Sequence, residues 1–283
     1  MNYRHAFHAG NFADVIKHAT LVRILVHLRT KPAPFRVIDT HAGSGRYDLD
    51  DSNAGRGGEW REGIARLLAA APSQRVKELL APYFEAVGSL NPSFKLTAYP
   101  GSPLLARAFL REGDRVIACE LEPGAAAALA RNLRGDHRCK AIAIDGWSAV
   151  NAYVPPKERR GLVLIDPPFE EPADFERLGN AVEAAHRKWA SGIYLLWYPL
   201  KERQGADALA RRLRRSDISK ILRAEINLPK PRNGDRLSAC GLIIVNPPWT
   251  LEGELRLLLP EFVTALAQRD GGGHRLDWLA GEG

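Results

Sequence analysis

Cysteine is scarce in this chain, and the few cysteines argue against two kinds of structural site. The 283 residues include only Cys119, Cys139 and Cys240, and no two of them form a Cys-x-x-Cys pair. An odd number of widely spaced thiols indicates neither a disulfide framework nor a structural zinc site. We therefore expect a protein of the reducing cytoplasm.

Long apolar runs are also missing. No run approaches the roughly 18 apolar residues that a membrane span needs, and the first residues, MNYRH, lack the apolar stretch of a signal peptide. The hydrophobic fraction of 45% is nevertheless ample for a sizeable core. We expect a globular protein without a membrane partner.

Acidic charge is the minority, although only by a modest margin. The net charge is +7 and the pI is about 9.4, which favours a polyanionic partner such as a nucleic acid without establishing one. The basic run at residues 211–215 fits a solvated helical face and a phosphate contact about equally well.

Metal-binding motifs are absent despite a concentration of histidine. Five of the eight histidines fall within the first 41 residues, but no His-x-x-x-His carries an acidic partner. A polar pocket lining is therefore a better interpretation than a metal site, and no metal is expected. The five are His5, His8, His18, His27 and His41.

The most informative stretch is residues 161–169, GLVLIDPPF. Its first five residues have no polar side chain, which predicts a strand buried on both faces, and two prolines then end it. Asp166 is thereby placed at the carboxyl end of a strand, where α/β sheets bind ligands. The structural alternative is a buried strand that simply runs into a proline turn.

A carboxylate, a rigid turn and an aromatic ring suit one kind of substrate. An exocyclic amine can donate to the carboxylate of Asp166 and to the carbonyl of Pro167, while its ring stacks on Phe169. This is the chemistry of methylating an adenine N6. The tetrapeptide resembles the Asp/Asn-Pro-Pro-aromatic signature of adenosylmethionine-dependent amino-methyltransferases, in which the fourth residue is most commonly Tyr. Here Phe169 lacks the hydroxyl.

A nucleotide-binding half precedes this stretch. A β-branched strand at 35–39 runs into Gly43-Ser44-Gly45, a turn whose backbone can approach a ligand, although this glycine pattern alone is weak. The expected helix is delayed by residues 48–98, which we interpret as a helical insertion that serves as a lid or contacts RNA. Ser102, as N-cap before Pro103, is expected to start that helix.

Further strands each end in an acid. The strand at 115–120 ends at Glu120, which suits ribose hydroxyls, and the strand at 141–144 precedes Asp145, which suits the amino group of an adenine. The alternative is that these acids only cap helices. A fifth strand at 192–199 and an antiparallel pair at 220–228 and 237–245 would complete the sheet.

A second proline turn, Asn246-Pro247-Pro248-Trp249, is a rival for the catalytic role because it fits the same signature. Position favours Asp166, which closes the fourth strand, whereas Asn246 closes a late strand expected at the far edge of the sheet. We interpret Asn246 as a structural strand terminator.

With these residues in view, the chain closely resembles the bacterial 23S ribosomal RNA (adenine-N6)-methyltransferase J family over essentially its full length. The resemblance is carried by YRHAFHAGNFADVIKH, DTHAGSGRY, YPGSP, CELEP, DGW, LIDPPF and VNPPW. It implies an α/β fold, a Rossmann-like class I adenosylmethionine-dependent methyltransferase with a small helical insertion. The methyltransferase domain would be 1–47 and 99–283, with 1–30 over the active site and 48–98 as the insertion subdomain.

The resemblance also implies the site. Catalysis would involve Asp166, Pro167 and Phe169, and Tyr3 and His5 would contact substrate near the reaction centre. S-adenosyl-L-methionine would be bound by Lys17, His18, His41, Ser102, Glu120, Asp145, Gly146 and Asp166.

The predicted function is direct methyl transfer to N6 of an unpaired adenine in 23S rRNA, either naked or in an assembly intermediate, by a cytoplasmic monomer. Two other amino-methyltransferases remain as alternatives, one acting on DNA adenine and one on protein glutamine. From a different class, a non-catalytic RNA-binding or ribosome-assembly protein on the same fold also remains. A nicotinamide dehydrogenase is disfavoured by the broken glycine pattern.

Overall fold

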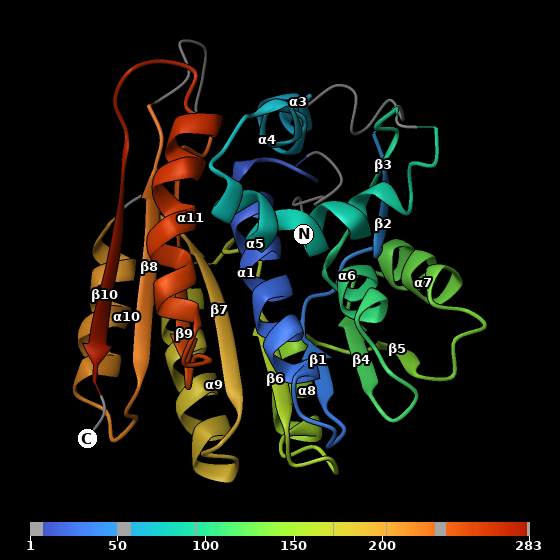
Figure 1. Ribbon diagram of the computed structural model, residues 1–283. Coiled ribbons are helices and arrows are strands. Elements are labelled where there is room, and N and C mark those ends of the chain that lie inside the picture. Colours follow the sequence, from blue (N-terminus) through green and yellow to red (C-terminus); the bar gives the residue numbers. More distant parts are fainter. Residues whose placement is uncertain are drawn as a thin grey trace.

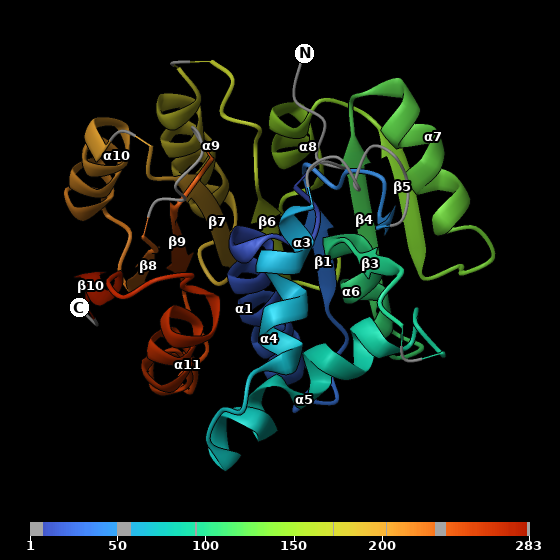
Figure 2. The same ribbon diagram turned by 90° about the horizontal axis from the view of Figure 1, so that it is seen from above.

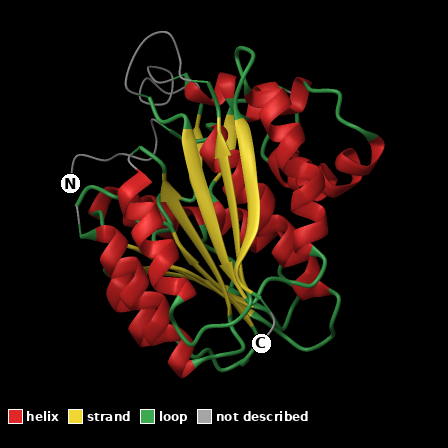
Figure 3. Ribbon diagram, turned by 90° about the vertical axis from the view of Figure 1, so that its left-hand side faces the viewer, coloured by secondary structure: helices red, strands yellow, loops and turns green. Residues whose placement is uncertain are grey.

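One twisted sheet runs through the whole molecule, with helices on both of its faces (Figure 1, Figure 3). The computed structural model describes residues 8–49, 58–93, 95–171, 173–201, 203–229 and 236–281. The predicted substrate residues Tyr3 and His5 lie outside the described residues.

The main sheet has eight strands in the order β10-β8-β9-β7-β6-β1-β4-β5. Strands β5, β4, β1, β6 and β7 are parallel, whereas β9 runs antiparallel to both β7 and β8, and β10 runs antiparallel to β8. The strands are β1 (Arg36–Asp39), β4 (Arg115–Glu120), β5 (Cys139–Ala143), β6 (Gly161–Ile165), β7 (Ile193–Pro199), β8 (Ile221–Asn227), β9 (Ala239–Val245) and β10 (Gly273–Ala280).

The predicted parallel strands and the antiparallel pair are confirmed, with two corrections. The pair does not form the edge, because β10 adds a further strand outside β8. The sequence of β10, GHRLDWLA, mixes polar and apolar residues and is only partly buried, so no run of apolar residues predicted it. Strand β9 consequently lies inside the sheet, between β7 and β8, and the expectation that it lies at the far edge is wrong.

Two helical layers cover the sheet (Figure 2). The core on one face includes residues of α1 (Phe12–Arg29), α5 (Gln74–Gly88), α6 (Ser102–Ala108) and α11 (Leu251–Leu266). The core on the other face includes residues of α8 (Gly146–Tyr153), α9 (Asp174–Lys188) and α10 (Arg203–Arg214). Helix α7 (Pro123–Asn132) packs on β4 and β5, and its buried residue Leu129 belongs to the first core.

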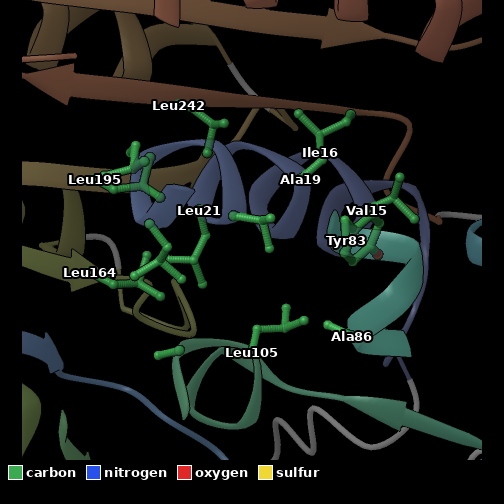
Figure 4. Close-up of a cluster of buried hydrophobic side chains, with 14 of the residues drawn as sticks. Val15, Ile16, Ala19, Leu21, Tyr83, Ala86, Leu105, Leu164, Leu195 and Leu242 are labelled. Atoms are coloured by element: carbon green, nitrogen blue, oxygen red, sulfur yellow. The ribbon is translucent and has the colours of Figure 1, made fainter. Parts of the chain in front are cut away.

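Helix α1 is the centre of the first layer. Its N-cap is Asn11, whose side chain accepts a hydrogen bond from the amide of Asp14 at 3.0 Å. The helix has no single apolar face, because Val15, Ile16, Ala19 and Leu21 are all buried at different angles around it (Figure 4). Polar side chains on such a helix are buried too and need partners within the protein.

The described residues of the predicted insertion are mainly helical, and two short paired strands flank them. Strands β2 (Arg46–Asp48) and β3 (Ala98–Pro100) pair antiparallel, and the amide of Leu49 donates to the carbonyl of Thr97 at 2.8 Å. Between them lie α3 (Glu59–Glu62), α4 (Ile64–Ala69) and α5, whose apolar residues join the core cluster around α1.

Candidate functional site

The carboxyl ends of β1, β4 and β6 open onto one cleft of about 1030 Å³. The chain passes from β1 to β4 on one side and later returns to β6 on the other, so the cleft lies where the strand order reverses, as ligand sites in α/β sheets do. The lining includes all eight predicted cofactor residues together with Pro167: Lys17, His18, His41, Ser102, Glu120, Asp145, Gly146 and Asp166.

The glycine turn after β1 is fixed against the end of β4. Gly43 has φ +60°, and a Cβ there would lie 2.1 Å from the hydroxyl of Tyr47, so glycine is required. The amide of Gly43 donates to Glu120 Oε2 at 2.8 Å. The turn and the predicted ribose acid therefore form one hydrogen-bonded unit at the wall of the cleft.

The two strand-end acids have backbone partners and also face the cleft. Glu120 Oε1 accepts from the amide of Glu122 at 2.8 Å, and Asp145 caps α8 by accepting from the amide of Ser148 at 2.8 Å. The capping alternative thus describes part of what Asp145 does. Because an ionised carboxylate offers about four acceptor positions, each acid retains capacity for ligand hydroxyl or amino groups.

His41 presents an acceptor to the cleft. The hydroxyl of Thr40 donates to the carbonyl of Leu164 at 2.9 Å, so His41 Nδ1, 2.8 Å from that hydroxyl, must donate its proton to it. Burial lowers the pKa of His41 to about 4, which keeps the ring neutral with a lone pair on Nε2. A Cβ on Gly146 would lie 2.5 Å from this nitrogen, so only glycine fits beside it.

A buried ion triad joins α1 to the proline turn. Lys17 Nζ lies 2.8 Å from Asp14 Oδ1 and also contacts Asp166 Oδ2, and the Lys17 side chain is 5% exposed. Burial opposes its charge, but the two carboxylates prevail and raise the pKa of Lys17 well above its ordinary value. Asp14 also accepts from the amide of Gly10 at 2.9 Å, which ties the triad to the start of the helix.

Phe169, the residue expected to stack on the substrate ring, lies beside the cleft and does not line it. Its ring centroid lies 4.7 Å from that of Phe175 and 5.8 Å from that of Trp197. Its φ of +51° is unusual for an aromatic residue. The turn therefore directs this ring into an aromatic cluster beside the cleft, and a stacking role for Phe169 stays a prediction.

Ser102 also needs correction. Gly101 is the N-cap of α6 and Ser102 is its first residue, buried but lining the cleft, because the extended backbone of Gly101 already provides the helix entry.

Sequence reasoning missed two buried acids near this cleft, Asp14 and Asp39. The carboxylate of Asp39, at the end of β1, has no hydrogen-bond partner for either oxygen among the residues that the structure describes. Burial raises its pKa to about 7, against the opposing effects of Ser102 and Lys17. The sequence signal for Asp14 was an acidic residue three positions before Lys17 in a helix rich in apolar residues.

Asn246 lies at the end of the strands opposite to the cleft. Since β9 is antiparallel to β7, Val245 pairs with Tyr194 at the start of β7. Asn246 Nδ2 donates to the carbonyls of Ala190 and Gly192 at 2.7 and 2.8 Å. The side chain is thus used to hold the loop before β7.

Two other predictions concern charges away from the triad. Within the described ranges, no group of three or more His, Cys, Asp or Glu side chains is arranged to hold a metal ion. In the basic run, Arg212 forms a two-point ion pair with Glu183 at 2.7 Å, which favours a structural role for that residue.

No described helix is long and apolar enough to cross a membrane.

The sheet order, the glycine turn and the acids around the cleft define the class of protein: a Rossmann-like class I methyltransferase that uses S-adenosylmethionine. Comparison with known proteins specifies the family. The family model described as RsmJ, ribosomal RNA large subunit methyltransferase D, RlmJ, matches residues 32–280.

Individual relatives agree with this match. Ribosomal RNA large subunit methyltransferase J of Escherichia coli (strain K12) is 38% identical over 282 residues, and that of Haemophilus influenzae is 38% identical over 283 residues; each match covers 100% of both chains. The solved structure of protein LPL1258 from Legionella pneumophila has a TM-score of 0.86 and 34% identity, covering 96% of this chain and 98% of that one. The chain belongs to the RlmJ family of ribosomal RNA large subunit methyltransferases.

Proposed function

We propose that this enzyme transfers a methyl group from S-adenosylmethionine to N6 of a specific unpaired adenine in 23S ribosomal RNA. The observation that carries the proposal is the position of Asp166, at the carboxyl end of β6, in the cleft and beside the buried cation Lys17. The name of its relatives, ribosomal RNA large subunit methyltransferase J, supports RNA as the acceptor.

The residues around the cleft suit the methyl donor. Glu120 would accept from ribose hydroxyls and Asp145 from the adenine amino group, and each is held in place by a backbone amide. His18, His41, Ser102, Gly146 and Lys17 complete the proposed binding site. S-adenosylmethionine supplies an electrophilic methyl group on a sulfonium.

Asp166 and Pro167 would act on the acceptor. The exocyclic amine of adenine is a poor nucleophile because its lone pair is delocalised into the ring. The Asp166 carboxylate and the Pro167 carbonyl would accept hydrogen bonds from its two N–H groups, which localises the lone pair as attack develops. Holding both reactants in line is worth up to about 7–11 kcal/mol in well-oriented systems. The proton displaced from N6 is transferred to Asp166 and then to solvent.

The RNA substrate has to present its base outside a stack. An adenine that is paired in a duplex cannot enter the cleft at the carboxyl end of β6. An unpaired adenine can be turned out of its stack at a modest cost in free energy. Arg131 and Arg177 line the cleft and offer cations to the adjacent phosphates. Tyr3, His5 and Phe169 are proposed to contact the base, and residues 48–98 are proposed to form a subdomain of the domain built from 1–47 and 99–283.

The expected setting follows from the acceptor. Ribosomal RNA is made and assembled in the bacterial cytoplasm, so a cytoplasmic enzyme is proposed, acting as a monomer on naked RNA or on an assembly intermediate.

The test is transfer of labelled methyl from S-adenosylmethionine to unmodified 23S RNA, 16S RNA, duplex DNA and a protein extract, followed by nucleoside analysis. We expect N6-methyladenosine in 23S RNA alone. Label in DNA adenine or in glutamine would replace the proposed acceptor by one of the alternative substrates. Binding of S-adenosylmethionine with no labelled acceptor would favour the non-catalytic RNA-binding or ribosome-assembly role.

A further inference from the structure

The insertion grips the start of α1 through the side chain of Glu59, on α3, which packs on α1 (Figure 2). Glu59 Oε2 lies 3.0 Å from Asn11 Nδ2 and 3.0 Å from His8 Nδ1, and Glu59 Oε1 lies 3.8 Å from Arg236 Nε. Burial opposes the charge of Glu59, but the hydrogen bonds from His8 and Asn11 and the charge of Arg236 prevail and lower its pKa. Three segments that are remote in the sequence therefore meet at one ionised carboxylate.

The backbone of the same region is fixed by a second contact with the insertion. The carbonyl of Gly10 accepts a hydrogen bond from the amide of Ile64, at the start of α4, at 2.9 Å. A Cβ on Gly63, between α3 and α4, would lie 2.1 Å from that carbonyl oxygen, so only glycine allows the two segments to approach this closely. The insertion thus binds residues 10 and 11 through both backbone and side chain.

Asn11 carries the contact from the insertion into α1. Its Oδ1 accepts from the amide of Asp14 at 3.0 Å and caps the helix, while its Nδ2 donates to Glu59. Because an ionised carboxylate can only accept, the amide of Asn11 satisfies both partners in one orientation alone. An aspartate at this position would cap the helix equally well but could not donate to Glu59. The side chain at position 11 therefore has to accept on one side and donate on the other.

From Asn11 the contacts continue to the proposed catalytic carboxylate. Asp14, whose amide is bound by Asn11, accepts from the amide of Gly10 at 2.9 Å and lies 2.8 Å from Lys17 Nζ. Lys17 in turn contacts Asp166. All side chains on this path are mostly buried, so a displacement of Asn11 has little free space in which to be absorbed before it reaches Lys17.

We infer that Glu59 and Asn11 are positioning residues that set the place of Lys17 relative to Asp166. Neither is among the residues that line the cleft, so they act through Lys17 and not on a ligand. This inference rests on the proposed function, in which Asp166 accepts hydrogen bonds from the acceptor amine and Lys17 helps to bind the methyl donor. The first helix of the insertion thereby contributes to methyl transfer without contacting either reactant.

The test exchanges the donor and the acceptor. Asn11→Asp keeps the helix cap but places a second carboxylate against Glu59. We expect the single-turnover rate at saturating 23S RNA to fall about tenfold and the Kd for S-adenosylhomocysteine to rise about fivefold. Glu59→Gln keeps an acceptor for Asn11 and should change both quantities by less than about threefold. In the double variant Asn11→Asp/Glu59→Gln the amide can donate to the carboxylate, and both quantities should return to within about threefold of wild type.

Folding is controlled separately, by circular dichroism of each variant at the assay temperature. If Asn11→Asp does not fold, Asn11→Ser takes its place, because serine also caps a helix but makes no contact with Glu59 and adds no charge. It should lower the rate about fivefold. The matched control is Asn246→Asp, the same substitution at an asparagine whose Nδ2 binds two carbonyls at the opposite end of the strands. This control should lower the melting temperature and leave the rate and the Kd unchanged.

The outcomes separate positioning from stabilisation, and this inference from the proposed function. A merely structural contact would lower the melting temperature of Asn11→Asp or Asn11→Ser and leave the rate and the Kd of the folded protein unchanged. That result, or a double variant no better than Asn11→Asp, overturns the inference even if wild type methylates 23S RNA. The Kd requires no methyl acceptor, so its loss and recovery across the variants supports the inference even if 23S RNA proves not to be the substrate.

Discussion

The chain contains two proline turns of the same chemical type, and the fold uses them differently. Asp166-Pro167-Pro168 follows a parallel strand and lies in the cleft. Asn246-Pro247-Pro248 follows an antiparallel strand and lies at the opposite end of the strands. Asp166 meets a buried cation and a ligand-sized space. Asn246 uses its amide nitrogen to bind two carbonyl groups of the loop before β7.

The difference shows that strand direction, and not the tetrapeptide, decides whether the side chain before the two prolines lies in the cleft. The backbone differs too. In the second turn the left-handed residue is Asn246, with φ +50°, a residue type that tolerates this region. In the first turn it is Phe169, with φ +51°, where such a conformation costs on the order of 1–3 kcal/mol. Of the two proline turns, the one beside the cleft therefore carries the larger backbone strain.

Replacing Lys17 should have the largest effect, because the Asp166 turn contacts this cation. Lys17→Met leaves the carboxylates of Asp14 and Asp166 buried without a counter-charge, and we expect the free energy of unfolding to fall by about 3–5 kcal/mol. Denaturant titration checks this. The control is the double variant Lys17→Met/Asp14→Asn, which removes one carboxylate charge and should recover part of the loss; no recovery would mean that charge balance is not the cause.

The buried carboxyl group of Asp39, near the cleft, should make the free energy of unfolding depend on pH. Burial raises the pKa of Asp39 to about 7, so between its ordinary value and about 7 the folded protein keeps a proton that the unfolded chain has lost. The free energy of unfolding should therefore fall as pH rises through this window, by up to about 4 kcal/mol, and stay level above it.

Asp39→Asn provides the control for that prediction. It cannot ionise, so the stability difference between wild type and variant should change with pH in the window and be constant above it. A difference that is constant from pH 4 to pH 8 would contradict the assigned role of Asp39.

The far turn should matter for stability and not for catalysis. Asn246→Ala leaves the carbonyls of Ala190 and Gly192 without their donor, and we expect a loss of about 1–3 kcal/mol in the free energy of unfolding. The affinity for S-adenosylhomocysteine should be unchanged, as calorimetry can establish. A weakened affinity would show that Asn246 influences the cleft at the other end of the strands, which would contradict this expectation.

The aromatic residues that end the two turns give the smallest effects. Trp249 is 86% exposed, so Trp249→Ala should change the free energy of unfolding by less than about 0.5 kcal/mol. Phe169 contacts Phe175 and Trp197, so Phe169→Ala should cost more, about 1–2 kcal/mol. Thermal unfolding of both variants side by side would test this order, and equal losses would contradict it.

The elements that sequence predicted best are those specified by local patterns. The strand at 161–165 is apolar throughout and ends in prolines, so its burial and its end were readable without knowing its neighbours. The position of Asp166 at a strand end followed from the same pattern, and the glycine turn and the acids Glu120 and Asp145 were found in the same way.

What sequence missed depends on tertiary neighbours. Helix α1 is buried on almost every side because the sheet and helices α3, α5, α6 and α11 pack against it, and no periodicity within the helix indicates that. The pairing of Asp14 with Lys17 and the isolation of Asp39 depend on which elements meet around them. The hydrogen-bonded side chains of His18, Tyr83 and Tyr99 are far apart in the sequence and are brought together only by the fold.

One measurement tests the central claim most directly: the single-turnover rate of methyl transfer to 23S RNA by wild type, Asp166→Ala and Asn246→Ala. Ala at position 166 offers no acceptor to the amine of the base, so Asp166→Ala should lower the rate by about 10²–10⁴-fold. Asn246→Ala should transfer methyl at the wild-type rate. The account is contradicted if Asp166→Ala stays active, or if the loss of activity follows Asn246 instead.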